Sequence, residues 1–507
     1  FSIKGPAYLG FVSNAADFPV EEYFDYIIVG GGTAGCPLAA TLSEKFRVLV
    51  LERGGIPYGN QNVGSQEGFL STLRDTDRFT SPAQAFTSLD GVPNSRGRIL
   101  GGSSAINAGF YSRADDEFYE ASRINWGDLS SVNHSYEWVE KAIVFKPRLR
   151  RWQSTLRDGL LEAGINPYNG FTLDHKTGTK IGGSTFDSSG RRHSAADLLS
   201  YANPSNIDIV VEANVERVLL GTASSPAAVG VVFRDRMRRF HHALLRNKGE
   251  VLLCAGSIGS PQLLLLSGIG SRSYLASWGI PVAHHLPYVG RFLYDNPRNG
   301  ITIIPPVPIE HSLIQVVGIT NSGAYLEGAS NVVPFSVPST VFITVATLMQ
   351  KIIGPYSYGS LRLASTDVRE NPLVTFNYFR HPRDLERCIN GTRLMIAVLN
   401  TNAMRDMKFR LLSGDTSFRF IGHGLPPEGA SDAAVGEFCR RTVSSIWHYH
   451  GGCLVDKVVD SDLKVMGIDR LRVVDGSTFT VSPGTNPQAT LLMLGRFFGL
   501  KIMKERA

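Results

Sequence analysis

Two histidines near the end of the chain are the side chains best suited to acid–base chemistry. His448 and His450 lie in residues 445–453, SIWHYHGGC. An imidazole, with an ordinary pKa of about 6.5, can take a hydroxyl proton near neutral pH. The residues predict one base, which is either histidine.

A second chemical pattern lies near the start of the chain. Residues 26–29, YIIV, form a continuous apolar run that predicts a strand buried on both faces. The glycine-rich residues 30–35 follow, then a small-residue helix over 36–43 and a second buried strand over 47–51. This order is a βαβ unit with G-x-G-x-x-G at its strand-to-helix turn, which predicts dinucleotide binding.

Each glycine of this turn has a physical role. Gly30 permits the tight turn, Gly32 lets the backbone approach a pyrophosphate, and Gly35 lets helix and strand pack closely. The helix N-terminus offers free N–H groups to the phosphates. Glu52 lies 22 residues after Gly30, the usual offset for an acid that accepts from ribose hydroxyls. These residues do not distinguish NAD from FAD.

The rest of the chain alternates strands and helices. Short apolar runs predict strands over 207–211, 215–220 and 249–254, and residues 300–380 predict a sheet. A helix is expected to start near Ser260 and Pro261, with the proline in its first turn. Further helices are expected over 134–168, 384–410 and 432–445, and a strand, turn and helix over 471–503.

Composition limits the class of protein. The 507 residues are 43% hydrophobic with a net charge of +6, which excludes disorder for most of the chain. No apolar run approaches the ~20 residues that a membrane span needs. The basic residues are dispersed and lack nucleic-acid motifs, so we expect no nucleic-acid partner. The 52 glycines exceed the usual share of about 7% and need a local explanation.

Two more glycine clusters, residues 97–107 and 256–270, carry a family resemblance. They resemble the two long signatures of the glucose-methanol-choline (GMC) flavoenzymes, and the resemblance covers nearly the full chain. It implies FAD as cofactor and an α/β fold: a Rossmann-type FAD-binding domain interleaved with a substrate-binding domain built on a mostly antiparallel sheet with helices. The implied FAD-binding domain comprises 20–125, 190–300 and 446–507, the substrate-binding domain comprises 126–189 and 301–445, and residues 1–19 form an N-terminal arm.

The resemblance also implies site residues. His448 aligns with the family's base, and His450 takes its place if the alignment shifts by two residues. Asn486 aligns with the second catalytic position, Ile446 and Trp447 form an apolar substrate wall, and Arg298 contributes positive charge. The residues implied to bind FAD are Gly30, Gly32, Thr33, Ala34, Gly35, Glu52, Arg53, Ile99, Gly102, Ser103, Asn107, Ala108, Gly109, Phe110, Val215, Gly476, Pro487 and Gln488.

The implied reaction has two alternatives. Within the family the chain most resembles the plant hydroxynitrile lyases, which cleave cyanohydrins with a non-redox FAD. Those lyases have His at the position of Asn486 and Tyr at that of Ile446, and their substrate-side cysteine has no match in residues 318–337. We therefore favour oxidation of an apolar or aromatic primary alcohol to the aldehyde, with His448 as base and hydride transfer to flavin N5. Lysis of an aromatic cyanohydrin is the alternative, and a flavin-bound protein without activity is a third class.

Two N-glycosylation signals bear on the cellular compartment of the protein. Asn133 and Asn390 lie in N-glycosylation triplets, and the chain starts at Phe1, as a processed secretory protein does. The five cysteines lack metal-ligand spacing, so we expect no metal. The lyase resemblance implies a disulfide between Cys388 and Cys439, which suits an oxidising compartment. We expect a secreted or vacuolar monomer.

Overall fold

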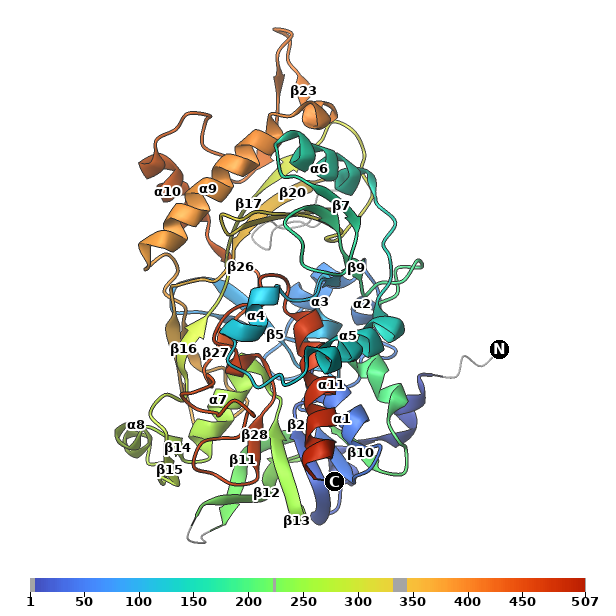
Figure 1. Cartoon of the computed structure of the whole chain (residues 1–507), viewed down its shortest axis with the longest axis vertical. Coiled ribbons are helices and arrows are strands. Elements are labelled where there is room, and N and C mark those ends of the chain that lie inside the picture. Colours follow the sequence, from blue (N-terminus) through green and yellow to red (C-terminus); the bar gives the residue numbers. More distant parts are fainter. Residues whose placement is uncertain (1–4, 222–224, 332–343, 507) are drawn as a thin grey trace.

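The computed structural model describes residues 5–221, 225–331 and 344–506. Two large sheets dominate it, one in the lower and one in the upper half of Figure 1. Each sheet is assembled from segments far apart in the sequence. The predicted α/β fold, with one Rossmann-type part and one mostly antiparallel part, is confirmed. The residue boundaries of the two domains stay a prediction.

The first sheet contains the predicted βαβ unit. Its order is β1-β10-β3-β2-β13-β12-β11, and β28 also pairs with β13. Strands β1, β10, β3, β2, β13 and β28 run parallel, whereas β12 pairs antiparallel with both β11 and β13. The strands are β1 (Val12–Asn14), β2 (Glu21–Val29), β3 (Val48–Leu51), β10 (Ile207–Val211), β11 (Asn214–Gly221), β12 (Ala227–Arg234), β13 (Phe240–Leu253) and β28 (Leu471–Val473).

The second sheet lies where residues 300–380 predict one. Its order is β25-β17-β20-β19-β18-β8-β7, with β26 on β17, and all its pairs are antiparallel except β7 with β8. The strands are β7 (Tyr168–Phe171), β8 (Gly178–Ile181), β17 (Pro297–Ile304), β18 (Val316–Ile319), β19 (Ala324–Ser330), β20 (Ala346–Ile352), β25 (Arg419–Ile421) and β26 (Ser444–Ser445).

A smaller sheet joins the two parts. Its order is β22-β21-β16-β27, from β16 (Arg291–Tyr294), β21 (Gly359–Arg362), β22 (Leu373–Thr375) and β27 (His450–Gly451). Strand β16 leads into β17 through two residues, and β27 begins two residues after His448. This sheet therefore fixes the loop that carries the predicted base.

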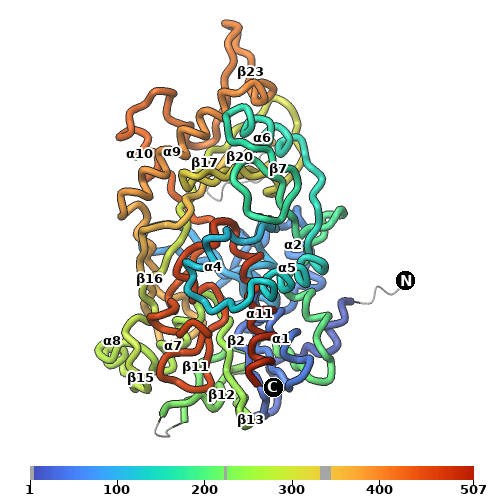
Figure 2. The backbone as a smooth tube through the Cα atoms, viewed as in Figure 1, coloured from blue at the N-terminus to red at the C-terminus, as the bar shows by residue number. Residues whose placement is uncertain are grey.

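Helices cover both large sheets. Helix α1 (Gly35–Leu42) packs on α11 (Gln488–Glu505), so an early helix and the last helix of the chain lie side by side, blue against red in Figure 2. Helices α6 and α9 pack on the second sheet. The remaining α-helices are α2 (Gln61–Gly64), α3 (Phe69–Arg74), α4 (Asp116–Ala121), α5 (Leu129–Ile143), α6 (Arg151–Glu162), α7 (Gly256–Leu266), α8 (Arg272–Ser277), α9 (Pro382–Leu399) and α10 (Asp432–Thr442).

Two local expectations were wrong. The single helix over 134–168 is two helices, α5 and α6, because residues 144–150 are extended before Trp152 docks in the second core. Helix α7 begins at Gly256, so Pro261 lies in its interior rather than its first turn. The Asp475 carboxylate accepts from Gly256 N (2.8 Å) and caps this earlier start, which no local pattern reveals.

Residues 5–19, the described part of the predicted N-terminal arm, pack into the body of the protein. Residues 12–14 form strand β1 and pair in parallel with β10 at the edge of the first sheet. Tyr8, in a 3-10 helix (Ala7–Phe11), is buried in the main core. The described part of the segment is thus built into the first sheet.

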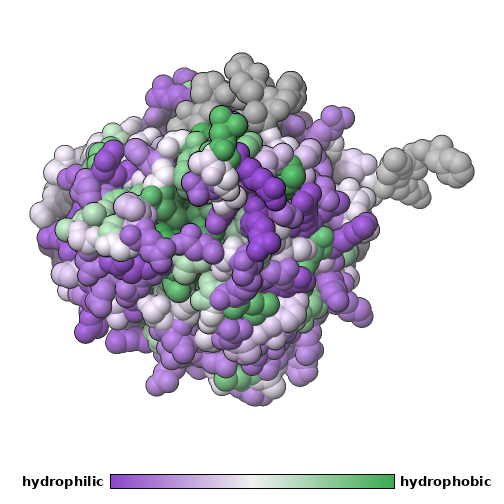
Figure 3. All heavy atoms as spheres, turned by 90° about the horizontal axis from the view of Figure 1, so that it is seen from above, coloured by the Kyte–Doolittle hydropathy of each residue, from purple (hydrophilic) through white to green (hydrophobic). Residues whose placement is uncertain are grey.

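The face of the molecule seen from above is mostly polar. Figure 3 looks down on the molecule from above and shows hydrophilic side chains over most of this face, with apolar ones in a hollow near its centre. Among the described residues no helix has the length and apolar character that crossing a membrane demands.

The Cys388–Cys439 pairing is confirmed: the two residues form a disulfide between α9 and α10, with a sequence separation of 51. Closing a loop of this size restricts the unfolded chain and stabilises by about 4 kcal/mol. We therefore expect the double variant Cys388→Ser, Cys439→Ser to lose about 4 kcal/mol in free energy of unfolding, measured by urea titration. Neither cysteine lines the cavity described below, so FAD content should not change. An unchanged urea midpoint would contradict the assignment.

Candidate active site

A cavity of about 750 Å³ runs from the first sheet to the second. This volume is typical of small-molecule and cofactor sites, about 300–1,000 Å³. All five residues predicted for catalysis or substrate binding line it: His448, Asn486, Ile446, Trp447 and Arg298. Of the predicted FAD-binding residues, these line it as well: Gly30, Gly32, Thr33, Ala34, Glu52, Arg53, Gly102, Ser103, Asn107, Ala108, Gly109, Phe110, Val215, Gly476, Pro487 and Gln488.

Two predicted FAD-binding residues lie outside the cavity wall. Ile99 is buried in a separate apolar cluster with Phe69 and Phe186. Gly35 opens α1, and a Cβ there would lie 2.1 Å from the carbonyl oxygen of Gly30. Gly35 therefore serves the close packing of helix against strand, as the sequence pattern predicts, and Ile99 serves packing.

The end of the cavity at the first sheet fits a dinucleotide. Strand β2 ends at Val29, and the turn that leads into α1 lines the cavity with Gly32, Thr33 and Ala34, so the positive end of the helix dipole lies at the cavity. A Cβ on Gly32 would meet nothing closer than 3.8 Å. That open space in front of the backbone is what an approaching pyrophosphate requires.

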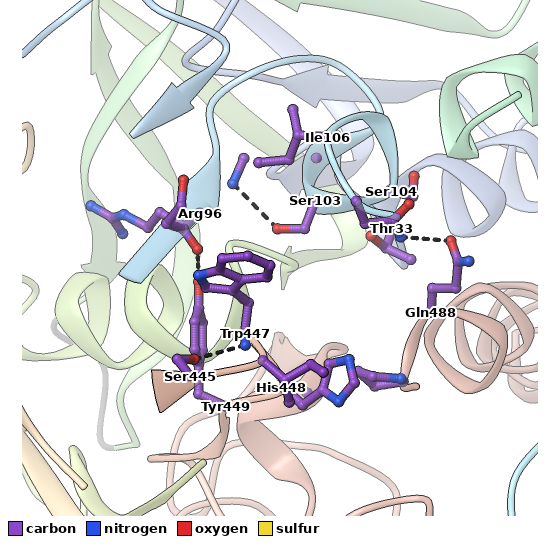
Figure 4. Close-up of a pocket in the computed structure, with 18 of the residues that line it drawn as sticks. Thr33, Arg96, Ser103, Ser104, Ile106, Ser445, Trp447, His448, Tyr449 and Gln488 are labelled. Carbon is purple, nitrogen blue, oxygen red and sulfur yellow. Dashed lines mark hydrogen bonds between the residues drawn. The ribbon is translucent and has the colours of Figure 1, made fainter. Parts of the chain in front are cut away.

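Glu52 and a hydrogen bond between Asn107 and Gln488 also fit a dinucleotide at this end of the cavity. Glu52 accepts from Gly31 N (3.1 Å) and Gly54 N (2.8 Å), and each carboxylate oxygen keeps a lone pair for a ribose hydroxyl. Asn107 Nδ2 donates to Gln488 Oε1 (2.8 Å), which ties the second glycine cluster to α11. Figure 4 shows Thr33, Ser103 and Gln488 around this part of the cavity. The residues present therefore fit FAD.

The loop that carries His448 is held in a costly conformation. Trp447 has φ +60°, in the left-handed region that a bulky side chain rarely adopts. Its N–H donates to Ser445 Oγ (2.7 Å). Behind the loop, Asp295 accepts from Tyr378 (2.5 Å), from Ser445 and from the His448 N–H. Burial outweighs these bonds and raises the pKa of Asp295 to about 7.

The structure distinguishes the two histidines. His448 keeps partial exposure toward the cavity, and its Nδ1 is buried without a partner among the described residues, which leaves Nε2 for the cavity side. His450 is 3% exposed, stacks on Tyr294 at 5.2 Å and points Nδ1 at the His448 carbonyl (3.2 Å). His450 is thus engaged in packing, while His448 is free to meet a ligand (Figure 4).

Electrostatics keep His448 neutral. Burial lowers its pKa well below 6.5, and the charges of Lys351, His450 and Arg298 lower it further. An imidazole without its proton near neutral pH is ready to accept one. Arg298 also lies over the Trp447 ring at 5.7 Å and donates from Nε to Ser444 Oγ (3.0 Å).

Three residues of the site escaped sequence reasoning. Lys351 on β20 donates from Nζ to Asn486 Oδ1 (2.8 Å). Glu327 on β19 lines the cavity, fully buried, and its oxygens lack a close partner among the described residues. Asp295 supports the His448 loop. Lys351 and Glu327 lie in a strand-rich region without a motif. Asp295 lies three residues before Arg298, so its position near a predicted site residue was a signal that could have indicated it.

Comparison with known proteins defines the class. Residues 24–298 and 355–495 match two models described as GMC oxidoreductase. The chain therefore belongs to the GMC oxidoreductase family, and its cofactor is FAD.

Relatives with different reactions match over nearly the full chain. An "(R)-mandelonitrile lyase-like" protein of Arabidopsis thaliana is 64% identical over 99% of this chain and 94% of its own. (R)-mandelonitrile lyase 1 of Prunus serotina is 49% identical (99% and 90%), and a sinalpyl alcohol oxidase of Nesocodon mauritianus is 47% identical (99% and 92%). A fungal aryl-alcohol oxidase structure has a TM-score of 0.76 at 21% identity, covering 96% of this chain and 99% of its own; at that identity it shows the fold alone.

Proposed function

We propose that this enzyme oxidises an apolar or aromatic primary alcohol to the aldehyde. The observation that carries the proposal is the pairing of one neutral imidazole, His448, with an amide, Asn486, on the cavity wall. Alcohol oxidation needs one base for the hydroxyl proton, and it needs a donor for the oxygen that becomes negative. The resemblance to a sinalpyl alcohol oxidase supports this reading.

The residues divide the work as follows. His448 Nε2 takes the proton of the substrate hydroxyl, and the Asn486 amide holds the oxygen. Trp447 and the 6% exposed Ile446 offer an apolar wall for the substrate body. The bound FAD supplies the acceptor for the hydride that leaves the carbinol carbon. The products are the aldehyde, one proton on His448 and reduced FAD, so atoms and electrons balance.

Cyanohydrin cleavage is the second candidate. Arg298 and Lys351 lie close enough to His448 to lower its pKa, and such a positive field favours departure of cyanide. The lyase relatives support it at 49% identity and below, as closely as the oxidase relative supports oxidation. Because one fold carries both reactions, the site chemistry has to decide.

Anaerobic mixing separates the two. We expect benzyl alcohol or a long-chain primary alcohol to bleach the flavin absorbance within a single turnover, because FAD is the only oxidant present. Mandelonitrile should leave the absorbance unchanged and release no cyanide. Cyanide release with an unbleached flavin would overturn the proposal in favour of the lyase. If the alcohols do not bleach the flavin and mandelonitrile releases no cyanide, both candidate functions are overturned.

We also propose passage through the secretory pathway. The Cys388–Cys439 disulfide persists best in an oxidising compartment. Asn133 on α5 and Asn390 on α9 are both exposed, as glycan acceptors must be. These features support secretion or delivery to the vacuole.

A further inference from the structure

Lys351 is a buried cation that does not touch the cavity. It is 1% exposed, lies on the central strand β20, and is absent from the cavity wall, which Asn486 lines. An ammonium buried this deeply is costly unless it is paired and hydrogen-bonded. Its partners therefore indicate why the chain keeps it.

Those partners all surround the Asn486 segment. Lys351 Nζ donates to Asn486 Oδ1 (2.8 Å) and lies 3.8 Å from the centre of the Tyr325 ring. Tyr325 and Lys351 are cross-strand neighbours on β19 and β20, and the Tyr325 hydroxyl is 3.1 Å from Thr485 Oγ1. One pair of strands thus holds two consecutive residues of the segment.

The hydrogen bond fixes which amide atom meets the substrate. A free asparagine side chain can turn by half a rotation and exchange its oxygen and nitrogen. An ammonium only donates, so it holds Oδ1 and leaves Nδ2 with its two N–H groups on the other side. Asn486 lines the cavity together with Glu327, and the Asn486 side chain lowers the pKa of the Glu327 carboxyl against a larger rise from burial.

We propose that Lys351 is a positioning residue that locks the Asn486 amide with its N–H groups toward the cavity. In this orientation Asn486 donates to the substrate oxygen as His448 removes the hydroxyl proton. In the flipped orientation the amide oxygen would face the developing negative charge and repel it. The inference rests on the proposed alcohol oxidation, and it extends that function to a residue outside the cavity.

A double-mutant cycle tests the proposal. Asn486→Ala removes the donor, and the loss of one such donor costs about 10²–10³-fold in kcat. Lys351→Met removes the lock and should lower kcat/KM by about tenfold or more, because the hydrogen bond donated to the substrate oxygen is lost. In the Asn486→Ala background, Lys351→Met should cost less than about twofold, since no amide remains to position. An equal loss in both backgrounds would overturn the proposal.

Lys180 offers a matched control. It is another fully buried lysine of the same sheet, on β8, and it bonds Ser112 Oγ (2.8 Å) away from the cavity wall. Lys180→Met should leave kcat and KM unchanged even if it destabilises the protein. Lys351→Met should retain FAD, read from the flavin absorbance, which separates lost positioning from misfolding.

A binding measurement tests the positioning role of Lys351 separately from the proposed alcohol oxidation, on which that role rests. Benzaldehyde, whose carbonyl oxygen accepts hydrogen bonds, is titrated into each holoenzyme, and the change in flavin absorbance gives Kd. Asn486→Ala and Lys351→Met should weaken binding, and the double variant should bind no more weakly than Asn486→Ala. Equal affinity in all variants would overturn the lock even if alcohol oxidation holds. Absence of oxidation with an intact binding cycle would overturn the proposed function alone.

Discussion

Replacing His448 by Gln is expected to lower kcat for alcohol oxidation by about a thousandfold. General-base catalysis contributes about 10²–10⁴-fold, and Gln preserves the size of the side chain without a basic nitrogen. The other His448 neighbours on the cavity wall, Trp447 and Asn486, are unchanged, so the variant should still bind FAD and substrate. Single-turnover flavin reduction, followed anaerobically by absorbance, measures the effect on the chemical step.

Two further histidine variants serve as controls. His450→Gln should reduce turnover far less, because the His450 ring is packed on Tyr294 and buried. His134→Gln, at an exposed position of α5, should have no effect. A severe loss in His450→Gln together with a mild one in His448→Gln would reverse the assignment of the base.

The pH profile gives an independent signature of the same base. The pKa of His448 lies well below 6.5, through burial first and then the nearby charges of Lys351, His450 and Arg298. A base must be unprotonated, so activity is lost as pH falls through its pKa. We expect kcat/KM of the wild type to stay flat as pH is lowered past 6.5, where a base of ordinary pKa would be half protonated. A midpoint at or above 6.5 would contradict the lowered pKa.

The nucleotide-binding half could be predicted from sequence because its signals are local. The strand, glycine turn and helix around Gly32 follow one another directly, and each glycine is required for a local steric reason. Helix α7 shows the opposite case. Its N-terminus is capped by Asp475, which lies 219 positions away in the chain, so the local pattern around Pro261 misplaced its start.

The catalytic half was predictable only in part. His448 and Asn486 stand in distinctive runs, so their types and spacing indicate chemistry. The roles of Lys351 and Glu327 depend on where the second sheet places them. The sequence of an alternating strand does not indicate that a lysine in it is buried and paired. A site built by sheet register across distant strands requires the three-dimensional structure.

Replacing Gly32 by Val is expected to give a folded protein that has lost FAD. A Cβ at this position would lie no closer than 3.8 Å to another atom, and the backbone φ is not in the left-handed region, so we expect the fold to accept the side chain. The same side chain would fill the space in front of α1 that a pyrophosphate needs. We expect FAD affinity to fall by about a hundredfold or more, equivalent to about 2.7 kcal/mol, measured by flavin fluorescence titration of the stripped protein.

The comparison must separate lost binding from lost folding. Because FAD itself stabilises the holoenzyme, the urea midpoint of Gly32→Val is compared with wild-type protein stripped of FAD, and the two should agree. Gly10→Val, at an exposed position with open space, should bind FAD normally. Gly35→Ala should lose both FAD and stability, because its Cβ would strike the Gly30 carbonyl. If Gly32→Val instead binds FAD like the wild type, the pyrophosphate does not pass this turn and the cofactor lies elsewhere in the cavity.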